Sequence, residues 1–158
     1  MQKQHKLLTF LSIICILSVI CMFLVLTSHD KSVVFTPPPF DATAEKGNPT
    51  IPNGLGYQML DAQIFHAGIC GEIIRTGDTI EVWFTNPESN SVWLKLRITD
   101  TDGRILGETG LLSPGQYVRY VILNTVPKPG TPIILKVMAY EPETYYSAGG
   151  FSINTYIQ

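Results

Sequence analysis

An uncharged apolar run near the amino terminus constrains this chain more than any other feature. The run extends from Leu7 to Leu26, reads LLTFLSIICILSVICMFLVL, and contains no Asp, Glu, Lys or Arg. A helix of about 20 residues that rises about 1.5 Å per residue covers roughly 30 Å, which is the thickness of a bilayer's hydrocarbon core. The sequence therefore predicts a transmembrane α-helix over residues 7–27.

The residues that flank the run predict its orientation. Lys3, His5 and Lys6 precede it, and basic flanks tend to remain in the cytoplasm. We therefore expect residues 1–6 to form a cytoplasmic tail and residues 28–158 to lie outside the cell. A cleaved signal peptide is the alternative, but its apolar region is usually shorter and ends in a small-x-small site, which Val25-Leu26-Thr27-Ser28 fits poorly.

Composition limits the exported part to one small domain. All 13 acidic residues follow the run, against nine of the 11 basic residues, so the exported part has a net charge of −4. Proteins that bind nucleic acid have the opposite charge balance, and no nucleic acid partner is expected. About 105 residues, 54–158, suffice for one domain with its own core.

A single cysteine lies outside the run. Cys15 and Cys21 fall within it, and Cys70 has no second cysteine with which to close an intramolecular disulfide. We expect Cys70 to be a small buried hydrophobe, and an intermolecular disulfide or a reactive thiol is the alternative. A cysteine nucleophile would need a base; His66 is close in sequence, but four residues of separation in an extended chain predict no contact.

Residues 28–53 predict an extracytoplasmic linker. They contain Pro37-Pro38-Pro39, Pro49 and Pro52 and show no sustained period of either helix or strand. Three consecutive prolines favour an extended conformation of about 3.1 Å per residue. Such a linker would hold the domain away from the membrane.

From Gly54 onward the dominant period is two, which is typical of half-buried strands. The hydrophobic positions of the two clearest segments are Ile80, Val82 and Phe84 in the first and Val92, Leu94, Leu96 and Ile98 in the second. If residues 86–90 form a simple hairpin loop, Trp83 faces Trp93 and Glu81 faces Lys95. This pairing fails if the two segments belong to different sheets, as successive strands of an immunoglobulin-like sandwich sometimes do.

Turn signals divide the rest of the domain into further strands. Asp102-Gly103, Ser113-Pro114-Gly115 and Pro127-Lys128-Pro129-Gly130 separate the alternating segments. The expected strands are one in which Val118, Tyr120 and Ile122 alternate, others at 133–139 and 150–156, and weaker ones at 57–65 and 71–75. About seven or eight strands without helical periodicity predict an all-β domain over 54–158, an antiparallel β-sandwich of immunoglobulin-like or jelly-roll-like type.

The chain lacks the common catalytic and cofactor motifs. It contains no His-Glu-x-x-His, no Gly-x-Ser-x-Gly, no phosphate loop and no dinucleotide fingerprint. We therefore expect no enzyme, no catalytic residue, no metal and no cofactor. Asp100-Thr101-Asp102-Gly103 is too short for a calcium loop and predicts a hairpin turn. Glu141-Pro142-Glu143-Thr144 likewise predicts a solvated turn between the last two strands.

Aromatic residues are the feature best able to support binding, because rings beside polar groups can hold a sugar or anchor a protein partner. Trp83 and Trp93 are expected on the outward face of their strands. The candidate binding residues are Trp83, Trp93, Lys95, Arg97, Tyr140, Tyr145 and Tyr146. Two alternatives stay open for the tryptophans: they form a cross-strand pair, or they lie beneath the segment 54–71.

Three turn-and-strand segments carry a resemblance to a known class of proteins. Asn86-Pro87-Glu88, Leu112-Ser113-Pro114-Gly115 and Ala139-Tyr140-Glu141-Pro142-Glu143-Thr144 resemble segments of small single-pass surface proteins of Gram-positive bacteria. Such proteins join a short basic tail, one span, a proline-rich stalk and one all-β domain. The resemblance implies an envelope protein of binding or assembly type, and it carries over no catalytic residue.

These observations predict a single-pass protein of the cell membrane with a cytoplasmic amino terminus and an extracellular domain. The domain is expected to bind an envelope protein non-covalently or to take part in the assembly of a surface structure. A module that binds carbohydrate or a cell-wall polymer is the first alternative, and a shallow planar platform of rings would favour it. An enzyme or redox protein centred on Cys70 and His66 is the second.

Overall fold

The computed structural model of this chain describes His5 and residues 13–22 and 35–158. The chain divides into two compact units, Met1–Thr36 and Pro37–Gln158. In the first unit, residues 13–22 form a helix, and the remainder of the predicted span lies outside the described residues. Among the described residues, no helix combines the length and the apolar character that a membrane crossing needs.

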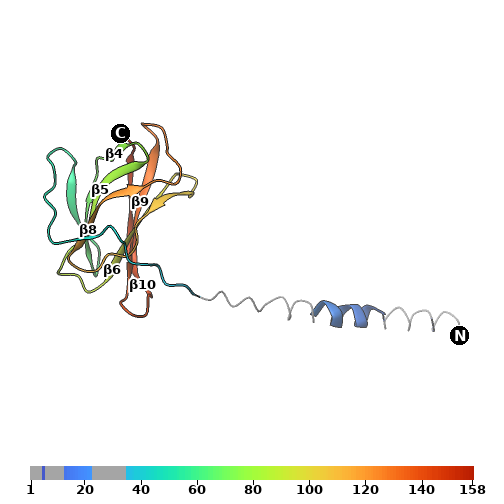
Figure 1. Cartoon of the computed structure of the whole chain (residues 1–158). Helices are drawn as coiled ribbons and strands as arrows, with labels where there is room; N and C mark the ends of the chain where they lie inside the picture. Colours follow the sequence, from blue (N-terminus) through green and yellow to red (C-terminus); the bar gives the residue numbers. More distant parts are fainter. Residues whose placement is uncertain (1–4, 6–12, 23–34) are drawn as a thin grey trace. The chain divides into compact units, whose positions relative to one another are not determined.

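The second unit is built from two antiparallel sheets (Figure 1). The six-stranded sheet contains β1 (Glu45–Lys46), β2 (Tyr57–Asp61), β3 (His66–Cys70), β4 (Ile74–Thr76), β5 (Thr79–Asn86) and β8 (Gln116–Ile122). The four-stranded sheet contains β6 (Trp93–Thr99), β7 (Ile105–Glu108), β9 (Pro132–Tyr140) and β10 (Ser147–Tyr156). The strand orders are β1-β8-β5-β3-β2, with β4 also on β5, and β10-β9-β6-β7.

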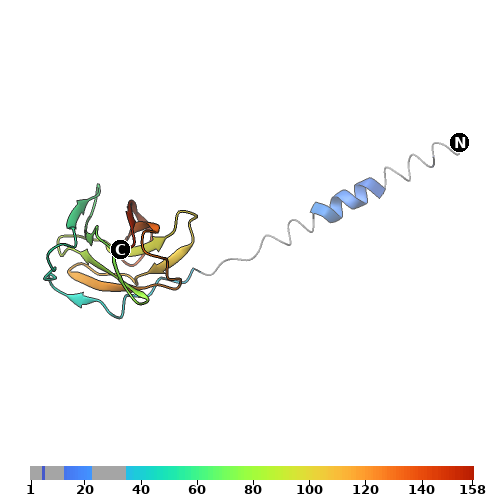
Figure 2. The ribbon, with the colours of Figure 1, turned by 90° about the horizontal axis from the view of Figure 1, so that it is seen from above.

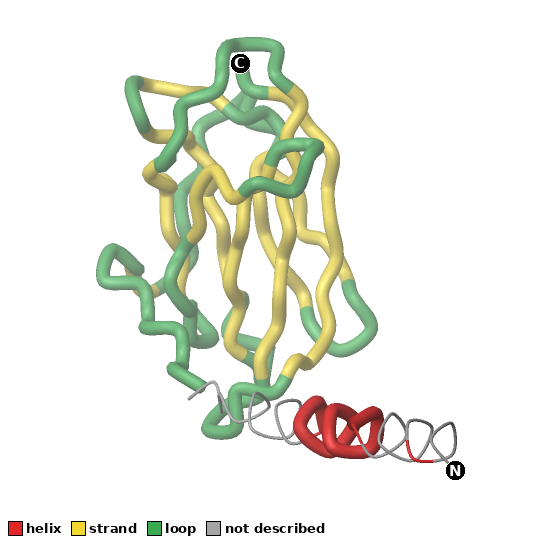
Figure 3. Tube along the Cα trace, turned by 90° about the vertical axis from the view of Figure 1, so that its right-hand side faces the viewer, coloured by secondary structure: helices red, strands yellow, loops and turns green. Residues whose placement is uncertain are grey.

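The two sheets share one hydrophobic core. The strands form two layers (Figure 3), and one buried cluster takes side chains from both of them. The predicted inward positions are confirmed in three strands: Ile80, Val82 and Phe84 in β5, Leu94, Leu96 and Ile98 in β6, and Ile133, Leu135, Val137 and Ala139 in β9 are all buried. The alternation of these strands therefore predicted which side chains fill the core.

The predicted hairpin between β5 and β6 is wrong, because the two strands belong to different sheets. Trp93 faces Tyr140 of β9 instead of Trp83, and Lys95 faces Met138 instead of Glu81. Asn86, which is fully buried, supplies the physical reason. Its side-chain amide donates to the carbonyl oxygens of Val92 at 2.9 Å and Leu112 at 2.8 Å, so backbone groups remain satisfied where the chain leaves one sheet for the other.

The alternation predicted for β8 is also only partly correct. Val118 is buried, but Tyr120 and Ile122 are exposed, and Val121 is buried in their place. The register between β5 and β8 shifts by one residue between Glu81 and Phe84, which marks a bulge in β5. A bulge changes which residues of the partner strand lie opposite one another, and a period read from β8 alone does not contain that information.

Strand β3 was not predicted, although weak strands were expected on either side of it. The expected strand 57–65 contains β2 and a turn, and 71–75 overlaps the start of β4. Within β3 the last four residues are all buried, so the sequence Ala67-Gly68-Ile69-Cys70 has no polar positions to alternate with apolar ones. Strands buried on both faces lack the period of two.

Part of the predicted linker belongs to the β-rich unit, which begins at Pro37 rather than at Gly54. Phe40 forms a parallel bridge with Leu111, and strand β1 pairs with β8. The Asp41 carboxylate accepts a hydrogen bond of 2.8 Å from the Gly110 backbone N–H. A short edge segment of this kind needs neither sustained alternation nor freedom from proline, which is why the composition did not reveal it.

The predicted turn at Asp102-Gly103 is confirmed between β6 and β7. The Asp100 carboxylate accepts hydrogen bonds from the backbone N–H groups of Asp102 and Arg104 and from the Arg104 guanidinium. Desolvation alone would raise the pKa of Asp100, but these bonds and the charge of Arg104 lower it below its ordinary value. The carboxylate thus organises the turn in its ionised form.

The carboxyl terminus is built into the unit. Seen from above, it lies within the outline of the strands (Figure 2). Ile157 is buried, and Gln158 donates its backbone N–H to the carbonyl oxygen of Ile73 at 2.9 Å. The end of the chain after β10 therefore lies beside the start of β4, a contact between the two sheets.

Candidate functional site on the four-stranded sheet

Five of the seven predicted binding residues lie on or beside one face of the four-stranded sheet. Trp93, Lys95 and Arg97 alternate along β6 with the core residues, and Tyr140 ends β9 opposite Trp93. Tyr145 lies in the turn between β9 and β10. Because successive side chains of a strand point to opposite faces, these residues share the side of the sheet away from the core. We call this side the outer face.

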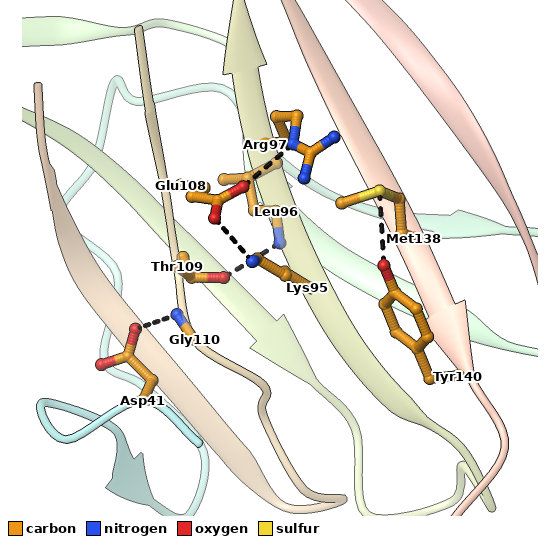
Figure 4. A network of polar contacts seen from close by, with 9 residues as sticks. All are labelled: Asp41, Lys95, Leu96, Arg97, Glu108, Thr109, Gly110, Met138 and Tyr140. Carbon is orange, nitrogen blue, oxygen red and sulfur yellow. Dashed lines mark hydrogen bonds and ion pairs between the residues drawn. The ribbon is translucent and has the colours of Figure 1, made fainter. Parts of the chain in front are cut away.

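Aromatic rings gather at one end of the outer face. The Trp93 ring centroid lies 4.8 Å from that of Phe40, with the ring planes at 77°, and 5.1 Å from that of Tyr145, at 58°. The hydroxyl of Tyr140, the residue opposite Trp93, donates to the Met138 sulfur at 3.7 Å (Figure 4). We call Phe40, Trp93, Tyr140 and Tyr145 the aromatic cluster. Phe40 was not predicted to belong to the site because it lies in the segment assigned to the linker.

Polar contacts fix the segment that carries Phe40. The Asp41 carboxylate accepts from Gly110, and the hydroxyl oxygen of Thr109 accepts a hydrogen bond of 2.9 Å from the backbone N–H of Leu96 (Figure 4). The backbone N–H of Asp41 also donates to the carbonyl oxygen of Leu111 at 2.9 Å. These bonds tie the segment before β1 to the residues after β7, so Phe40 is held against Trp93.

A charged group lies beside the aromatic cluster on the same face. Glu108 of β7 accepts from the Lys95 ammonium at 2.7 Å through one carboxylate oxygen and from the Arg97 guanidinium at 2.9 Å through the other (Figure 4). The Lys95 side chain is only 8% exposed. Desolvation would raise the pKa of Glu108, but the two cations that donate to it lower it below its ordinary value. The group has two positive charges and one negative charge.

Trp83 does not belong to the outer face, and the expectation that it is exposed is wrong. It lies in the six-stranded sheet and is only 4% exposed, packed with Leu55 and Cys70 in a second apolar cluster. Its indole N–H donates to the Glu81 carboxylate at 2.7 Å, and the Arg119 guanidinium lies 4.5 Å from the ring centroid. The alternative that a tryptophan lies beneath residues 54–71 is correct for Trp83.

Cys70 and His66 occupy opposite ends of β3. The Cys70 side chain is fully buried, and desolvation, followed by the charge of Glu81, raises the pKa of its thiol to about 12. The His66 ring lies 2.6 Å from the Asp61 carboxylate. Four steps of about 3.3 Å along a strand separate the two residues, so the structure does not bring them together. Among the described residues, no group of three or more His, Cys, Asp or Glu side chains is placed to hold a metal ion.

Two of the hollows on the surface of the β-rich unit concern the candidate site. One of about 360 Å³ adjoins the outer face and is lined by Lys136, Met138, Ser147, Gly149, Gly150, Phe151 and Ser152. A larger one of about 670 Å³ includes the carboxylates of Asp41, Glu45, Glu81 and Glu108 in its lining. The Asp41 and Glu108 carboxylates already accept the hydrogen bonds described above, so the larger hollow has fewer free acceptors than its composition suggests.

The structure thus brings Trp93, Lys95, Arg97, Tyr140 and Tyr145 together, adds Phe40 and Glu108, and leaves Trp83 apart. Tyr146, beside Tyr145, is 74% exposed. A comparison of the chain with models of protein families matches none of them, and a comparison with curated proteins likewise gives no match.

Proposed function

We propose that this protein is a membrane-anchored, extracytoplasmic β-sandwich of immunoglobulin-like type that binds a protein partner in the cell envelope or joins a surface assembly. The proposed anchor is the apolar run over 7–27, which leaves the amino terminus in the cytoplasm. The proposed binding surface is the outer face of the four-stranded sheet. Its centre is the aromatic cluster, with Lys95, Arg97 and Glu108 beside it.

The arrangement of the aromatic cluster carries this proposal. Trp, Tyr and Arg are the residues that most often dominate the binding energy of protein interfaces, and they do so from well-packed positions surrounded by polar groups. Trp93 is half-buried between Phe40 and Tyr145, and Arg97 is held by Glu108. A partner that docks on side chains already fixed in place would lose less conformational entropy on binding.

Ring geometry favours a protein partner over a carbohydrate. A sugar stacks on a shallow platform whose rings lie close to one plane, and the two rings that contact Trp93 are inclined to it by 77° and 58°. The burial of Trp83 removes the second tryptophan from any such platform. An irregular apolar cluster with a charged rim suits a protein surface better.

The course of the chain supports the finer assignment of the fold. The segments after β5, after β7 and after β8 each pass from one sheet to the other, while the core lies between the two sheets. Such crossings between two antiparallel sheets are characteristic of immunoglobulin-like sandwiches. The anchor rests on the apolar run, of which residues 13–22 are helical and carry no charge.

The proposal is tested in intact cells with the full-length protein. We would express it in a Gram-positive host and treat the intact cells with an amine-reactive cross-linker, which can react with Lys136 on the outer face. The protein is then purified, and the molecules that are cross-linked to it are identified. Trp93→Ala is the test variant. Tyr120→Ala is the matched control, since it removes an exposed ring from the other sheet.

We expect one discrete partner protein with the unmodified chain and with Tyr120→Ala, and at least a ~10-fold smaller yield with Trp93→Ala. Equal yields with both variants would remove the aromatic cluster from the interface. Recovery of wall polymer without a partner protein would replace the proposal by the carbohydrate-binding alternative.

A further inference from the structure

Strand β10 forms a long edge of the four-stranded sheet. Among the residues that the structure describes, it pairs with β9 along its length and has no second strand on its other side. Its ten residues, SAGGFSINTY, include neither a charged residue nor a proline. Natural edge strands are usually short, or carry charges or proline, because an unprotected edge is a template for pairing with another chain. This edge has a bulge at one end, and residues 71–75 lie beside its other end.

Hydrogen bonds at the end of the chain show which way the backbone of β10 points. Ile157 donates its N–H to Thr131, on the side of β9, whereas Gln158 donates to Ile73 and accepts from Arg75 on the opposite side. Backbone direction alternates along an antiparallel strand. Counting back by two from Gln158, the outward backbone groups of β10 are those of Ser152, Asn154 and Tyr156.

The edge already accepts a strand at its last residues. Ile73 and Ile157 form a parallel bridge, and Gln158 bonds to the chain between Ile73 and Arg75. The Thr155 hydroxyl also donates to the Gly71 carbonyl oxygen at 2.8 Å, so the part of the edge that remains open in the described structure lies between Gly150 and Asn154. An extended segment of a few residues could continue along this line with the same kind of hydrogen bonds.

The smaller hollow lies beside this open part of the edge. Gly150 is required there, because a Cβ at that position would lie 2.4 Å from the carbonyl oxygen of Val137. Met138 provides an apolar wall on the side of the sheet that carries Lys136. Lys136, which faces Ser152 across the strands, is exposed and forms no ion pair with any described carboxylate. The hollow therefore offers one free cation beside an apolar wall.

We propose that the open edge of β10 takes an extended segment of a protein partner as a fifth strand, and that this segment places a carboxylate side chain beside Lys136. The inference rests on the proposed function, since it specifies how a protein partner engages the same sheet. Backbone hydrogen bonds along Ser152 and Asn154 would supply affinity, and the hollow with Lys136 would supply selectivity. The β10 strand of a second copy carries no carboxylate, so self-pairing would leave Lys136 without its counter-charge.

Two capped peptides, TVTVEVTV and TVTVKVTV, serve as probes for the full-length protein in detergent micelles. We expect the glutamate peptide to bind at least ~10-fold more tightly than the lysine peptide in a fluorescence polarisation titration, which corresponds to about 1.4 kcal/mol. Hydrogen exchange should show new protection of the Ser152 and Asn154 amides. This measurement needs no variant and therefore tests the site whether or not a variant folds.

Asn154→Pro is the decisive variant. Its N–H points away from β9, so proline removes an outward donor and leaves the β9 ladder intact, and peptide binding should be lost. Met59→Pro is the matched control on the β2 edge of the other sheet: Ala62 donates to Phe65 toward β3, and the same alternation directs the Met59 N–H outward. Lys136→Glu should reverse the preference between the two peptides.

Other results would overturn the inference. Binding that survives Asn154→Pro, no binding of either peptide, or protection confined to other strands would each do so. A dimer that Asn154→Pro dissociates would assign the edge to a second copy instead. If the cellular partner is lost with Trp93→Ala but retained with Asn154→Pro, the proposed function stands while the edge site fails.

Discussion

The outer surfaces of the two sheets differ in what lies over them. On the six-stranded sheet, Trp83 and Cys70 form a second apolar cluster with Leu55, which the chain before β2 places over them. On the four-stranded sheet, charged and aromatic side chains occupy the equivalent side, and the hollow beside β10 is open. One sheet is therefore packed on both sides, whereas the other is packed on one side and available on the other.

The two tryptophans differ in burial because of this difference between the sheets. Each is an aromatic residue at a polar position of an alternating strand, and the alternation assigns both to the side away from the core. Trp83 is then buried because the segment containing Leu55, far away in sequence, covers it. Trp93 receives only partial cover from Phe40 and Tyr145. A strand's own sequence determines which side a residue takes, but distant segments determine whether that side is exposed.

Alanine substitution of the two tryptophans should give the largest contrast. Trp83→Ala removes a buried ring and should lower the free energy of unfolding by about 3–5 kcal/mol, while Trp93→Ala should cost at most about 1–2 kcal/mol because its ring is half-exposed. Denaturant unfolding of the full-length protein in micelles, followed by circular dichroism, measures both. Equal losses would show that the outer face of the four-stranded sheet contributes as much to stability as the covered one.

The reactivity of the Cys70 thiol should show that the segment around Leu55 buries this side of the six-stranded sheet. With its pKa raised from 9.0 to about 12, Cys70 should hold ~1000-fold less thiolate at pH 8 than an ordinary cysteine, and the thiolate is the species that reacts. We expect alkylation of Cys70, followed by peptide mass spectrometry, to be at least ~100-fold slower in the folded protein than in denaturant. Rapid labelling of the folded protein would mean that the segment around Leu55 opens easily.

The sequence predicted the core residues of three strands and the side of the sheet on which three of the candidate site residues lie. Alternation identified the buried residues of β5, β6 and β9, and Trp93, Lys95 and Arg97 were expected on the side where they lie. The pairing of β5 and β6 was not predictable from the pattern, because cross-strand matching of Trp83 with Trp93 was chemically reasonable. What excludes it is the bond network of Asn86, which reaches Leu112 across 26 residues of chain.

Phe40 and Glu108 were missed for a similar reason. Phe40 lies in a proline-rich segment without a period, and its place in the site depends on bonds from Asp41 to the residues after β7. Glu108 is one carboxylate among 13 acidic residues, and only the register of β7 against β6 places it opposite Arg97. Local patterns carry no information about such long-range contacts.

Breaking the charged group should have a smaller effect than removing Trp83. Glu108→Ala leaves the buried Lys95 ammonium without its counter-ion, and we expect a loss of about 1–2 kcal/mol, less than for a fully buried pair because Glu108 is partly exposed. Adding Lys95→Met, which removes the buried charge and keeps an apolar side chain, should recover most of it. A double variant as unstable as Glu108→Ala would show that the loss does not come from the unpaired ammonium.

The smallest expected effect is the loss of folding stability at acid pH that comes from protonation of Glu108. The folded-state pKa of Glu108 lies below its ordinary value of 4.5, because hydrogen bonds from Lys95 and Arg97 outweigh the cost of desolvation. Such a group contributes its full stability above about pH 4.5, and the contribution is lost as the pH falls through the lower folded-state pKa. Asp100, whose pKa is also lowered, adds a loss of the same sign in the turn between β6 and β7. Between pH 5 and pH 3 the unfolding midpoint of Glu108→Gln should therefore decrease less than that of the unmodified protein, and the difference is the contribution of Glu108.

If the decrease is the same in Glu108→Gln and disappears in Asp100→Asn, the turn rather than the outer face controls the acid stability of the four-stranded sheet.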